Sequence, residues 1–303
     1  MDYSLLIGLC ERLGVEYRLN EPLNVHTTMK IGGECDIFVC PRGEEAAAEI
    51  VRFCIAEKFP YFVLGRGSNV LVSSKGYRGC IICLCGTVSR ISVSGNFITA
   101  DAGAGLLTVC RAALENSLSG LEFAAGIPGS IGGALYMNAG AYGGEMKDIV
   151  RSCRYIDENG ALCEMTADEM ELSYRHSVFS VRKCVILSVT MELRTGNKEQ
   201  IQARIAELMA KRREKQPLEY PSCGSTFKRP EGYFAAALIE ECGLKGFSVG
   251  GAQVSEKHSG FVINRENASY EDVVALVEHI KRTVREQKGV ELECEMLTLG
   301  ERE

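Results

Sequence analysis

The sequence lacks a hydrophobic run of the kind that crosses a membrane. Residues 123–144 contain no charged side chain and are long enough to span a bilayer. However, this stretch holds seven Gly, Pro128 and Asn138, and it has no sustained run of Leu, Ile and Val. Because glycine and proline favour turns, the composition predicts a system of loops here and argues against membrane insertion.

The sequence also lacks a strong excess of charge of either sign. It has 34 Lys and Arg against 40 Asp and Glu, a formal net charge of −6, so broad nonspecific nucleic-acid binding is not expected. The N-terminal residues include acidic Asp2 and Glu11 and no basic segment, unlike a signal peptide. We therefore expect a cytoplasmic protein whose 14 cysteines stay reduced and mostly fill the core.

The spacing of the cysteines does not favour a metal site. The one CxxC motif is Cys80-Ile81-Ile82-Cys83, followed by Cys85, in an apolar run typical of a buried strand. No second CxxC and no HxxxH are present to complete four zinc ligands, so we expect no metal.

With 303 residues, 46% of them hydrophobic, the chain is long enough for two or three domains. The order of strands and helices in the first part indicates an α/β unit. We place a domain boundary near Gly196, before a long charged helix. Hydrophobic periodicity predicts helices over residues 1–20, 44–58, 106–116, 198–215 and 233–242, and a C-terminal helix between a capping box at Ser269 and a C-cap at Gly289.

The first chemical motif is the glycine-containing turn over residues 65–69, directly after a predicted strand. Its backbone N–H groups can converge on an anion, and its Ser and Asn can add hydrogen bonds. It is not a GxGxxG fingerprint, because residue 70 is Val, and no GK[ST] of a Walker loop is present. A purely structural turn remains an alternative to phosphate binding.

The second motif is the uncharged, turn-rich segment over residues 126–135, with Pro128 and four glycines ahead of a predicted short helix. Backbone dipoles in such a loop suit a pyrophosphate. Two glycine-rich loops about 60 residues apart therefore indicate a dinucleotide held between them; close packing without a ligand is the alternative.

Three further motifs follow. Arg175 lies in SYRHSVFS among aromatic and apolar residues, where a lone Arg often pairs with a carboxylate. Ser225 lies in CGSTFKRP, which lacks the GxSxG elbow of a serine hydrolase. Catalysis by a thiol nucleophile at Cys223, with His258 as its base, remains an alternative.

In the tail, Glu291, Glu293 and Glu295 alternate with apolar residues, which predicts a strand with the carboxylates on one face.

In this order, the motifs resemble the bacterial UDP-N-acetylenolpyruvoylglucosamine reductase (MurB) family. The resemblance runs from NVHTTxxIGG, beginning at Asn24, to Glu295, and includes GRGSN, GIPGSIGGA with NAGAYGG, SYRxSxF and GSxFKxP. The spacing is similar to the shorter, type II branch, which lacks an insertion that carries a substrate-binding tyrosine loop.

The resemblance implies an α+β protein. Residues 1–196 would form an FAD-binding fold of the vanillyl-alcohol oxidase (PCMH) type, in two α/β subdomains of about 1–88 and 89–196. Residues 197–303 would form a C-terminal α+β substrate-binding domain, whose last strand carries Glu295 back to the active site. The residues expected to hold FAD are Gly65, Arg66, Gly67, Ser68, Asn69, Gly126, Ile127, Pro128, Gly129, Ser130, Gly132 and Gly133.

The resemblance also implies a reaction. NADPH would reduce the bound FAD, and the reduced flavin would pass hydride to the enolpyruvyl double bond of a UDP-sugar, giving UDP-N-acetylmuramate for peptidoglycan synthesis. Ser225 would protonate the carbanion or enol at carbon 2, with Arg175 and Glu295 stabilising that intermediate. Contacts to the substrate are expected from Tyr142, Arg212, Lys215 and Lys228.

Two other functions fit parts of the sequence. One is an oxidase of another sugar or alcohol on the same FAD fold, although the basic residues near GSTFKRP suit a nucleotide-linked anion better. The other is a nonenzymatic module that senses a phosphorylated nucleotide. The sequence indicates no particular protein partner.

Overall fold

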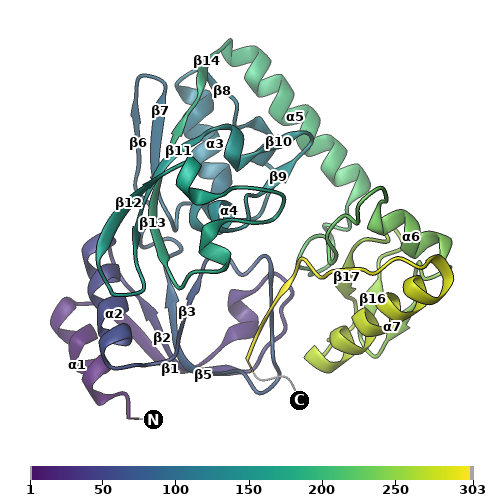
Figure 1. Cartoon of the computed structure of the whole chain (residues 1–303), viewed down its shortest axis with the longest axis horizontal. Helices are drawn as coiled ribbons and strands as arrows, with labels where there is room; N and C mark the ends of the chain where they lie inside the picture. Colours follow the sequence, from purple (N-terminus) through teal and green to yellow (C-terminus); the bar gives the residue numbers. More distant parts are fainter. Residues whose placement is uncertain (1, 301–303) are drawn as a thin grey trace. The chain divides into compact units, whose positions relative to one another are not determined.

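The computed structural model describes residues 2–300 and combines helices with several small sheets (Figure 1). The expected α+β class is therefore confirmed. The α-helices are α1 (Ser4–Leu13), α2 (Glu44–Ala56), α3 (Leu106–Glu115), α4 (Ile131–Tyr136), α5 (Lys198–Lys215), α6 (Ala235–Glu241) and α7 (Tyr270–Lys288). No helix within residues 2–300 is both long and apolar enough to cross a membrane.

The chain divides into two compact units, neither of which is continuous in sequence. The first unit contains the residues up to Leu19, Ile37–Arg66 and Gly79–Lys211. The second unit contains Asn20–Asp36, Gly67–Arg78 and the residues from Arg212 onward. This division differs from the expected boundary near Gly196, because it falls inside α5 and because two N-terminal segments join the C-terminal part.

Two larger sheets contain strands of the first unit. The four-stranded sheet has the order β1-β2-β5-β3, with β1 (Glu16–Pro22), β2 (Glu34–Cys40), β5 (Tyr77–Cys83) and β3 (Tyr61–Leu64). The five-stranded antiparallel sheet has the order β12-β11-β13-β7-β6, with β12 (Leu162–Thr166), β11 (Val150–Ile156), β13 (Val185–Glu192), β7 (Phe97–Asp101) and β6 (Ile91–Ser94). Short pairs, β8 (Leu118–Ser119) with β14 (Arg194–Thr195) and β9 (Gly140–Ala141) with β10 (Gly144–Glu145), complete this unit.

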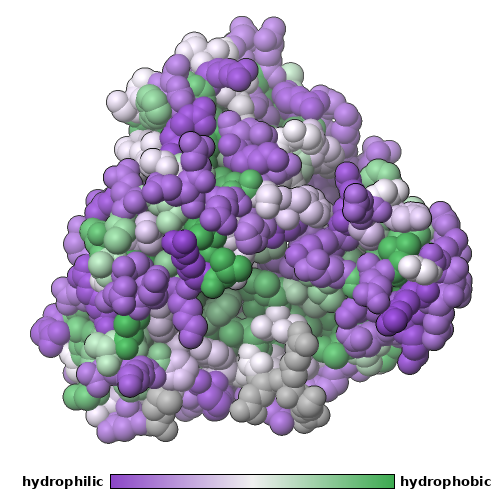
Figure 2. Space-filling model, viewed as in Figure 1, coloured by the Kyte–Doolittle hydropathy of each residue, from purple (hydrophilic) through white to green (hydrophobic). Residues whose placement is uncertain are grey.

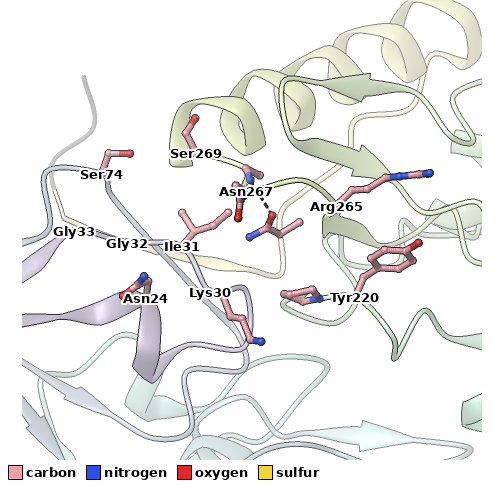
Figure 3. A pocket seen from close by; sticks show the side chains of 13 residues that line it. Asn24, Lys30, Ile31, Gly32, Gly33, Ser74, Tyr220, Arg265, Asn267 and Ser269 are labelled. Carbon is pink, nitrogen blue, oxygen red and sulfur yellow. Dashed lines mark hydrogen bonds between the residues drawn. The ribbon is translucent and has the colours of Figure 1, made fainter.

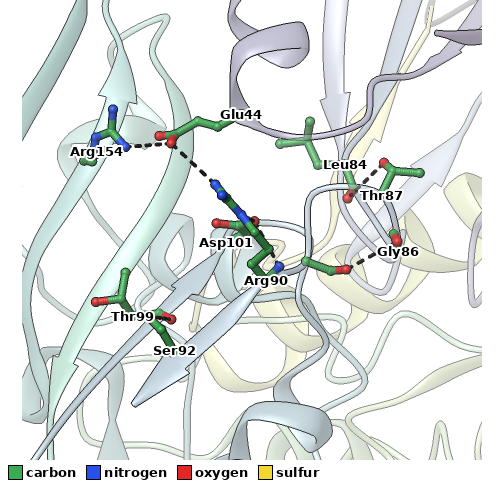
Figure 4. Close-up of polar contacts among 10 residues, drawn as sticks. Glu44, Leu84, Gly86, Thr87, Arg90, Ser92, Thr99, Asp101 and Arg154 are labelled. Carbon is green, nitrogen blue, oxygen red and sulfur yellow. Dashed lines mark hydrogen bonds and ion pairs between the residues drawn. The ribbon is translucent and has the colours of Figure 1, made fainter. Parts of the chain in front are cut away.

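A buried carboxylate joins α2 to the five-stranded sheet (Figure 4). Glu44, in the first turn of α2, is only 5% exposed. Its Oε2 accepts a hydrogen bond of 2.6 Å from Nη1 of Arg154 on β11, and Arg90 pairs in turn with Asp101 on β7. Because a buried charge is costly without a partner, this pair fixes how α2 packs on the sheet.

The second unit is built around α6 and α7. Its sheets are β15 (Ser248–Val249), β16 (Ala252–Val254) and β17 (Val262–Asn264), and the parallel pair β4 (Val70–Val72) and β18 (Leu297–Leu299). The capping box at Ser269 and the left-handed Gly289 bound α7 as predicted. The visible surface over α5 and α7 is largely hydrophilic (Figure 2), because α7 turns its apolar stripe inward and α5 buries only Ile201 and Leu208.

Two elements differ from the sequence-based prediction. The N-terminal helix ends at Leu13 rather than near residue 20, because Gly14 takes the left-handed conformation (φ 62) and β1 follows. The C-terminal strand begins only at Leu297, so the three glutamates before it do not share one strand face. The prediction that cysteines fill the core is confirmed for eight of the 14, which are buried, and all 14 are free thiols.

Candidate active site

Two predicted cofactor loops meet within the first unit. A Cβ atom added at Gly65 would lie 2.5 Å from the hydroxyl oxygen of Ser130, so position 65 has room for glycine alone. Ser130 is 2% exposed and caps α4, where its hydroxyl accepts a hydrogen bond from the N–H of Gly133. The turn at Gly65 and the loop before α4 are thus in direct contact.

These loops leave several backbone donors without a partner inside the protein. Within the part of the chain that the structure describes, no protein acceptor is present for the N–H groups of Gly65, Arg66, Gly126, Gly129 and Ser130. Such donors are rarely left without any partner in folded proteins, and they bind anions readily when they converge. The arrangement therefore fits the diphosphate of a dinucleotide, with Arg66 as a nearby cation.

A thiol also lies in this region. Burial raises the pKa of the Cys85 thiol, and the nearby Arg66 and Ser130 act in the opposite direction. The guanidinium of Arg66 lies beside Gly105, where an added Cβ would be 3.6 Å from Cζ. Arg66 thus lies near both Cys85 and Gly105, which the sequence did not reveal.

Gly132, at the start of α4, packs closely against another part of the protein. Gly132 and Gly133 lie in the first turn of the helix, and an added Cβ at Gly132 would be 2.8 Å from the Cβ of Ala102. The N–H groups of Ile131 and Gly132 bond to the carbonyls of Ala104 and Ala102. The close approach at Gly132 is therefore to Ala102, and the donors without a protein partner lie before the helix; a role of Gly132 and Gly133 in binding FAD stays a prediction.

Arg175 occupies the tip of a tight turn in the first unit. The backbones of Ser173 and His176 bond to each other in both directions at 3.1 Å, and Arg175 takes the left-handed conformation (φ 52). Its Nη2 donates to the carbonyl of Gly140 at 3.3 Å, and its guanidinium lies 5.0 Å from the centre of the Tyr174 ring. His176 interacts with Ser180, consistent with a supporting rather than a reacting side chain.

Asn138 holds this turn in place. It is fully buried, and its amide nitrogen donates to the carbonyl of Ser173 and to Glu145, each at 2.8 Å. Its amide oxygen accepts from the N–H of Lys147 at 2.9 Å. The sequence did not predict this role, although an Asn inside an apolar, glycine-rich stretch was the available signal.

In the second unit, Ser225 and Glu295 lie on neighbouring backbone segments. The N–H of Glu295 donates to the carbonyl of Thr226 at 2.9 Å, and the N–H of Lys228 donates to Glu293 at 2.8 Å, so residues 226–228 run antiparallel to residues 293–295. Ser225 is exposed and Glu295 is half-buried. The hydroxyl of Thr226 accepts from Val262 and anchors the Ser225 turn to β17.

Asn69, predicted to bind FAD, also positions Glu295. Its side chain donates to the carbonyl of Glu295 at 3.0 Å, and its own carbonyl accepts from the N–H of Leu297 at 2.9 Å. Gly67 packs against the backbone of His26 and Thr27, with Thr28 donating to its carbonyl. The second half of the GRGSN turn is therefore built into the second unit.

Cys223 does not have the properties of a nucleophile. Its side chain is 5% exposed and donates to the carbonyl of Val70, and burial raises the pKa of the thiol to about 12. A thiol in this state carries almost no thiolate at neutral pH. His258 accepts from the N–H of Gly260 at Nδ1.

The predicted substrate contacts are placed unevenly. Tyr142 is exposed in the first unit and takes a left-handed conformation (φ 53). Arg212 and Lys215 lie in the last turn of α5, and Lys228 forms an ion pair with Glu293. A phosphate at Lys228 would therefore compete with a carboxylate that is itself largely exposed.

A cavity of about 600 Å³ opens in the second unit (Figure 3). It is lined by Asn24, Lys30, Ser74, Tyr220, Arg265 and Asn267, among others, and by none of the predicted site residues. Nη1 of Arg265 donates a hydrogen bond of 2.7 Å to Oε1 of Gln253. Across residues 2–300, no group of three or more His, Cys, Asp or Glu side chains is arranged to hold a metal ion.

The loops of the first unit define the class of protein as one with an FAD-binding domain. The family model described as "FAD binding domain" matches residues 35–166, which include both glycine-rich loops. A second model, described as "UDP-N-acetylenolpyruvoylglucosamine reductase, C-terminal domain", matches residues 216–299, which include Ser225 and Glu295.

Whole-chain comparisons identify the family. UDP-N-acetylenolpyruvoylglucosamine reductase from Caldanaerobacter subterraneus subsp. tengcongensis is 48% identical over 94% of this chain and 94% of its own length. The enzyme of that name from Clostridium perfringens is 49% identical over 93% of this chain and 92% of its own. The crystal structure of UDP-N-acetylenolpyruvylglucosamine reductase from Thermus caldophilus matches with a TM-score of 0.80 and 34% identity, over 94% of this chain and 99% of that one. The chain belongs to the UDP-N-acetylenolpyruvoylglucosamine reductase family, which confirms the predicted resemblance and FAD-binding fold.

Proposed function

We propose that this protein is a cytoplasmic enzyme that reduces UDP-N-acetyl-3-O-(1-carboxyvinyl)-glucosamine to UDP-N-acetylmuramate at the expense of NADPH, in peptidoglycan precursor synthesis. The observation that carries the proposal is the pairing of the Ser225 turn with the Glu295 segment in the second unit. A hydroxyl and a carboxylate on adjacent segments suit protonation of a carbanion better than simple ligand binding.

FAD fits the loops of the first unit. The unpartnered N–H groups around Gly65 and Ser130 supply donors for its diphosphate, and Arg66 supplies a positive charge. When bound, the flavin would supply the redox chemistry, accepting hydride from NADPH and passing it to the substrate, which no side chain of the chain can do.

The protein side chains then stabilise the developing charge and donate the proton. Addition of hydride beta to the substrate carboxylate moves negative charge onto that carboxylate, and the Arg175 guanidinium stabilises it as a two-pronged donor. Ser225 holds the proton destined for carbon 2. A serine hydroxyl is a poor acid, so its proton transfer needs the electrostatic assistance that Arg175 and Glu295 supply.

The remaining contacts orient the substrate. We assign the diphosphate of the UDP-sugar to Arg212, Lys215 and Lys228, because cations bind phosphate through charge-assisted hydrogen bonds. Tyr142 would contact the sugar. The exposed position of Tyr142 and the location of the cations at the end of α5 support this assignment.

Replacement of Ser225 tests the proton-donor assignment. Ser225→Ala should leave flavin reduction by NADPH intact and lower turnover of the enolpyruvyl substrate by about 10²- to 10⁴-fold, the usual contribution of a positioned acid. Stopped-flow absorbance separates the two half-reactions. Ser222→Ala is the matched control, because the contact of Ser222 with Thr28 uses the backbone carbonyl and survives the substitution. Near-normal turnover of Ser225→Ala would remove this residue from the mechanism.

A further inference from the structure

Two exposed aromatic residues follow the Ser225 turn in the second unit. Tyr233 is 50% exposed and Phe234 is 63% exposed. Phe234 is the N-cap of α6, a position that favours Ser, Thr, Asp and Asn because their side chains accept a hydrogen bond from the first turn of the helix. A phenyl ring accepts no such bond, and it also exposes apolar surface to water. A residue that departs from local preferences in this way is typical of a functional position.

Arg229 holds the Phe234 ring in place. Its Cζ lies 4.6 Å from the centre of the ring, within the range of a cation–π interaction. A tight turn makes this contact possible, because the N–H of Tyr233 donates to the carbonyl of Pro230 at 3.1 Å and Gly232 takes the left-handed conformation (φ 76) that such a turn requires at its third residue. The ring is therefore oriented in advance and still accessible.

The segment before this turn links the ring to the proposed proton donor. Backbone hydrogen bonds of 2.9 and 2.8 Å pair residues 226–228 with residues 293–295 in antiparallel orientation. The Cα atom of Arg229, four residues after Ser225, lies within about 14 Å of the Cα atom of Ser225, the reach of a fully extended chain. We assigned Ser225 to the enolpyruvyl carbon and Lys228 to the diphosphate. In a UDP-sugar the base lies beyond the diphosphate, so the order of residues along this segment matches the order of groups along the substrate.

We propose that Phe234, held by Arg229, is the platform on which the nucleobase of the UDP-sugar stacks; this inference rests on the proposed function. A nucleobase has a flat π-face, and stacking on an aromatic side chain is a common way of binding it. Because the guanidinium already orients the ring, less conformational freedom is lost when the base binds. The base is remote from the reacting carbon, so this contact stabilises bound substrate and transition state equally. Phe234 therefore determines affinity for the uridine end of the substrate and leaves the rate of the bound complex unchanged.

Binding of UDP and of inorganic pyrophosphate to the FAD-loaded full-length protein separates the base from the diphosphate. We expect Phe234→Ala to weaken UDP binding at least about fivefold and to leave pyrophosphate binding unchanged, since only UDP carries a base. Isothermal titration calorimetry measures both affinities. Phe247→Ala is the matched control, because Phe247 is also exposed in this unit, at 39%, but its ring stacks on His279 at 4.5 Å. This control should bind UDP as the wild type does.

A tryptophan at position 234 reports stacking directly. The chain contains no Trp, so Phe234→Trp carries a single indole, and an indole ring keeps the cation–π interaction with Arg229. We expect this variant to bind UDP at least as tightly as the wild type, with fluorescence that UDP quenches and pyrophosphate does not. In steady-state kinetics, Phe234→Ala should raise KM for the UDP-sugar at least about fivefold with kcat nearly unchanged.

Two results would overturn the stacking assignment and leave the proposed reaction intact. One is equal UDP affinity in the wild type and Phe234→Ala, and the other is quenching of Phe234→Trp by pyrophosphate as strong as by UDP. A wild-type protein that binds no UDP would contradict the proposed reaction together with this inference.

Discussion

Arg175 combines a strained backbone with a side chain to which we assign a role in the reaction. A turn with positive φ at its third residue normally carries Gly or Asn there, and a long side chain costs about 1 kcal/mol or more in that conformation. Arg175 nevertheless adopts φ 52, held by the reciprocal bonds between Ser173 and His176. Such strain is retained where the side chain itself is needed, which supports the assignment of the guanidinium to the substrate carboxylate.

Replacement of Arg175 should therefore separate stability from activity. Because Asn tolerates the left-handed region, Arg175→Asn should unfold at the same urea concentration as the wild type or a slightly higher one. Turnover should fall by at least about 100-fold, since the charged donor is lost. Urea titration and steady-state kinetics measure the two effects. A variant with marked destabilisation and nearly normal turnover would show that Arg175 is structural.

His258 gives the stability of the protein a specific pH dependence. Burial lowers the pKa of His258, with Glu240 acting weakly in the opposite direction. The unfolded chain, with an ordinary histidine pKa of about 6.5, therefore takes up a proton before the folded chain does. Stability from this residue is fully present above about pH 6.5 and is lost as the pH falls toward the lowered folded pKa.

A glutamine at this position tests the effect. Urea midpoints measured at about pH 8 and pH 5.5 should fall more for the wild type than for His258→Gln, which has no charge to gain. The exposed Lys183→Gln serves as a control for general charge effects. Equal acid losses in wild type and His258→Gln would contradict the assignment.

At the level of elements, the three residues proposed to act in the reaction, Arg175, Ser225 and Glu295, lie in loops rather than in helices. Asn138 links the loop between α4 and β9 to the turn that presents Arg175, and it does so from a completely buried position. Replacing Asn138 by Ala removes its three hydrogen bonds, to Ser173, Glu145 and Lys147, each worth about 0.5–1.5 kcal/mol. The positions of these loops therefore depend on one amide side chain.

Asn138→Ala should lower both stability and turnover. We expect a loss of about 2 kcal/mol in the free energy of unfolding and a fall in kcat of at least about tenfold, because the Arg175 turn is no longer fixed. Differential scanning calorimetry and stopped-flow kinetics measure these quantities. Ser173→Ala is the control, because Asn138 bonds the backbone carbonyl of Ser173, which this variant retains. A variant that loses stability but keeps wild-type kcat would limit Asn138 to folding.

Some of these elements could be predicted from local sequence and others could not. Helix ends with strong local signals were predictable, as Ser269 and Gly289 show for α7. The packing of Gly132 in α4 was not, because its close contact is with Ala102, which no local pattern connects to it. In the same way, Glu291, Glu293 and Glu295 alternate with apolar residues, which is typical of a strand. The strand they precede, β18, is shorter, because its partner strand β4 pairs only with Leu297–Leu299.

For the whole molecule, the order of motifs predicted the family and the fold class, while the division into units required coordinates. Asn264 donates to the carbonyl of Met29, and Thr28 donates to the carbonyl of Ser222, so an N-terminal segment is integrated into the C-terminal unit. These contacts join residues about 200 positions apart. Hydrophobic periodicity has no means of revealing them, which explains why the expected boundary near Gly196 differs from the division inside α5.

We propose above all that the protein is an NADPH-dependent flavin reductase of an enolpyruvyl UDP-sugar. The most direct test is the visible absorbance spectrum of the purified, FAD-loaded protein, recorded without oxygen, first alone, then after NADPH and then after the UDP-sugar. The account predicts flavin absorbance that NADPH bleaches and that the enolpyruvyl UDP-sugar restores. A protein that binds no FAD, or whose reduced flavin is reoxidised by oxygen but not by the enolpyruvyl UDP-sugar, would contradict it.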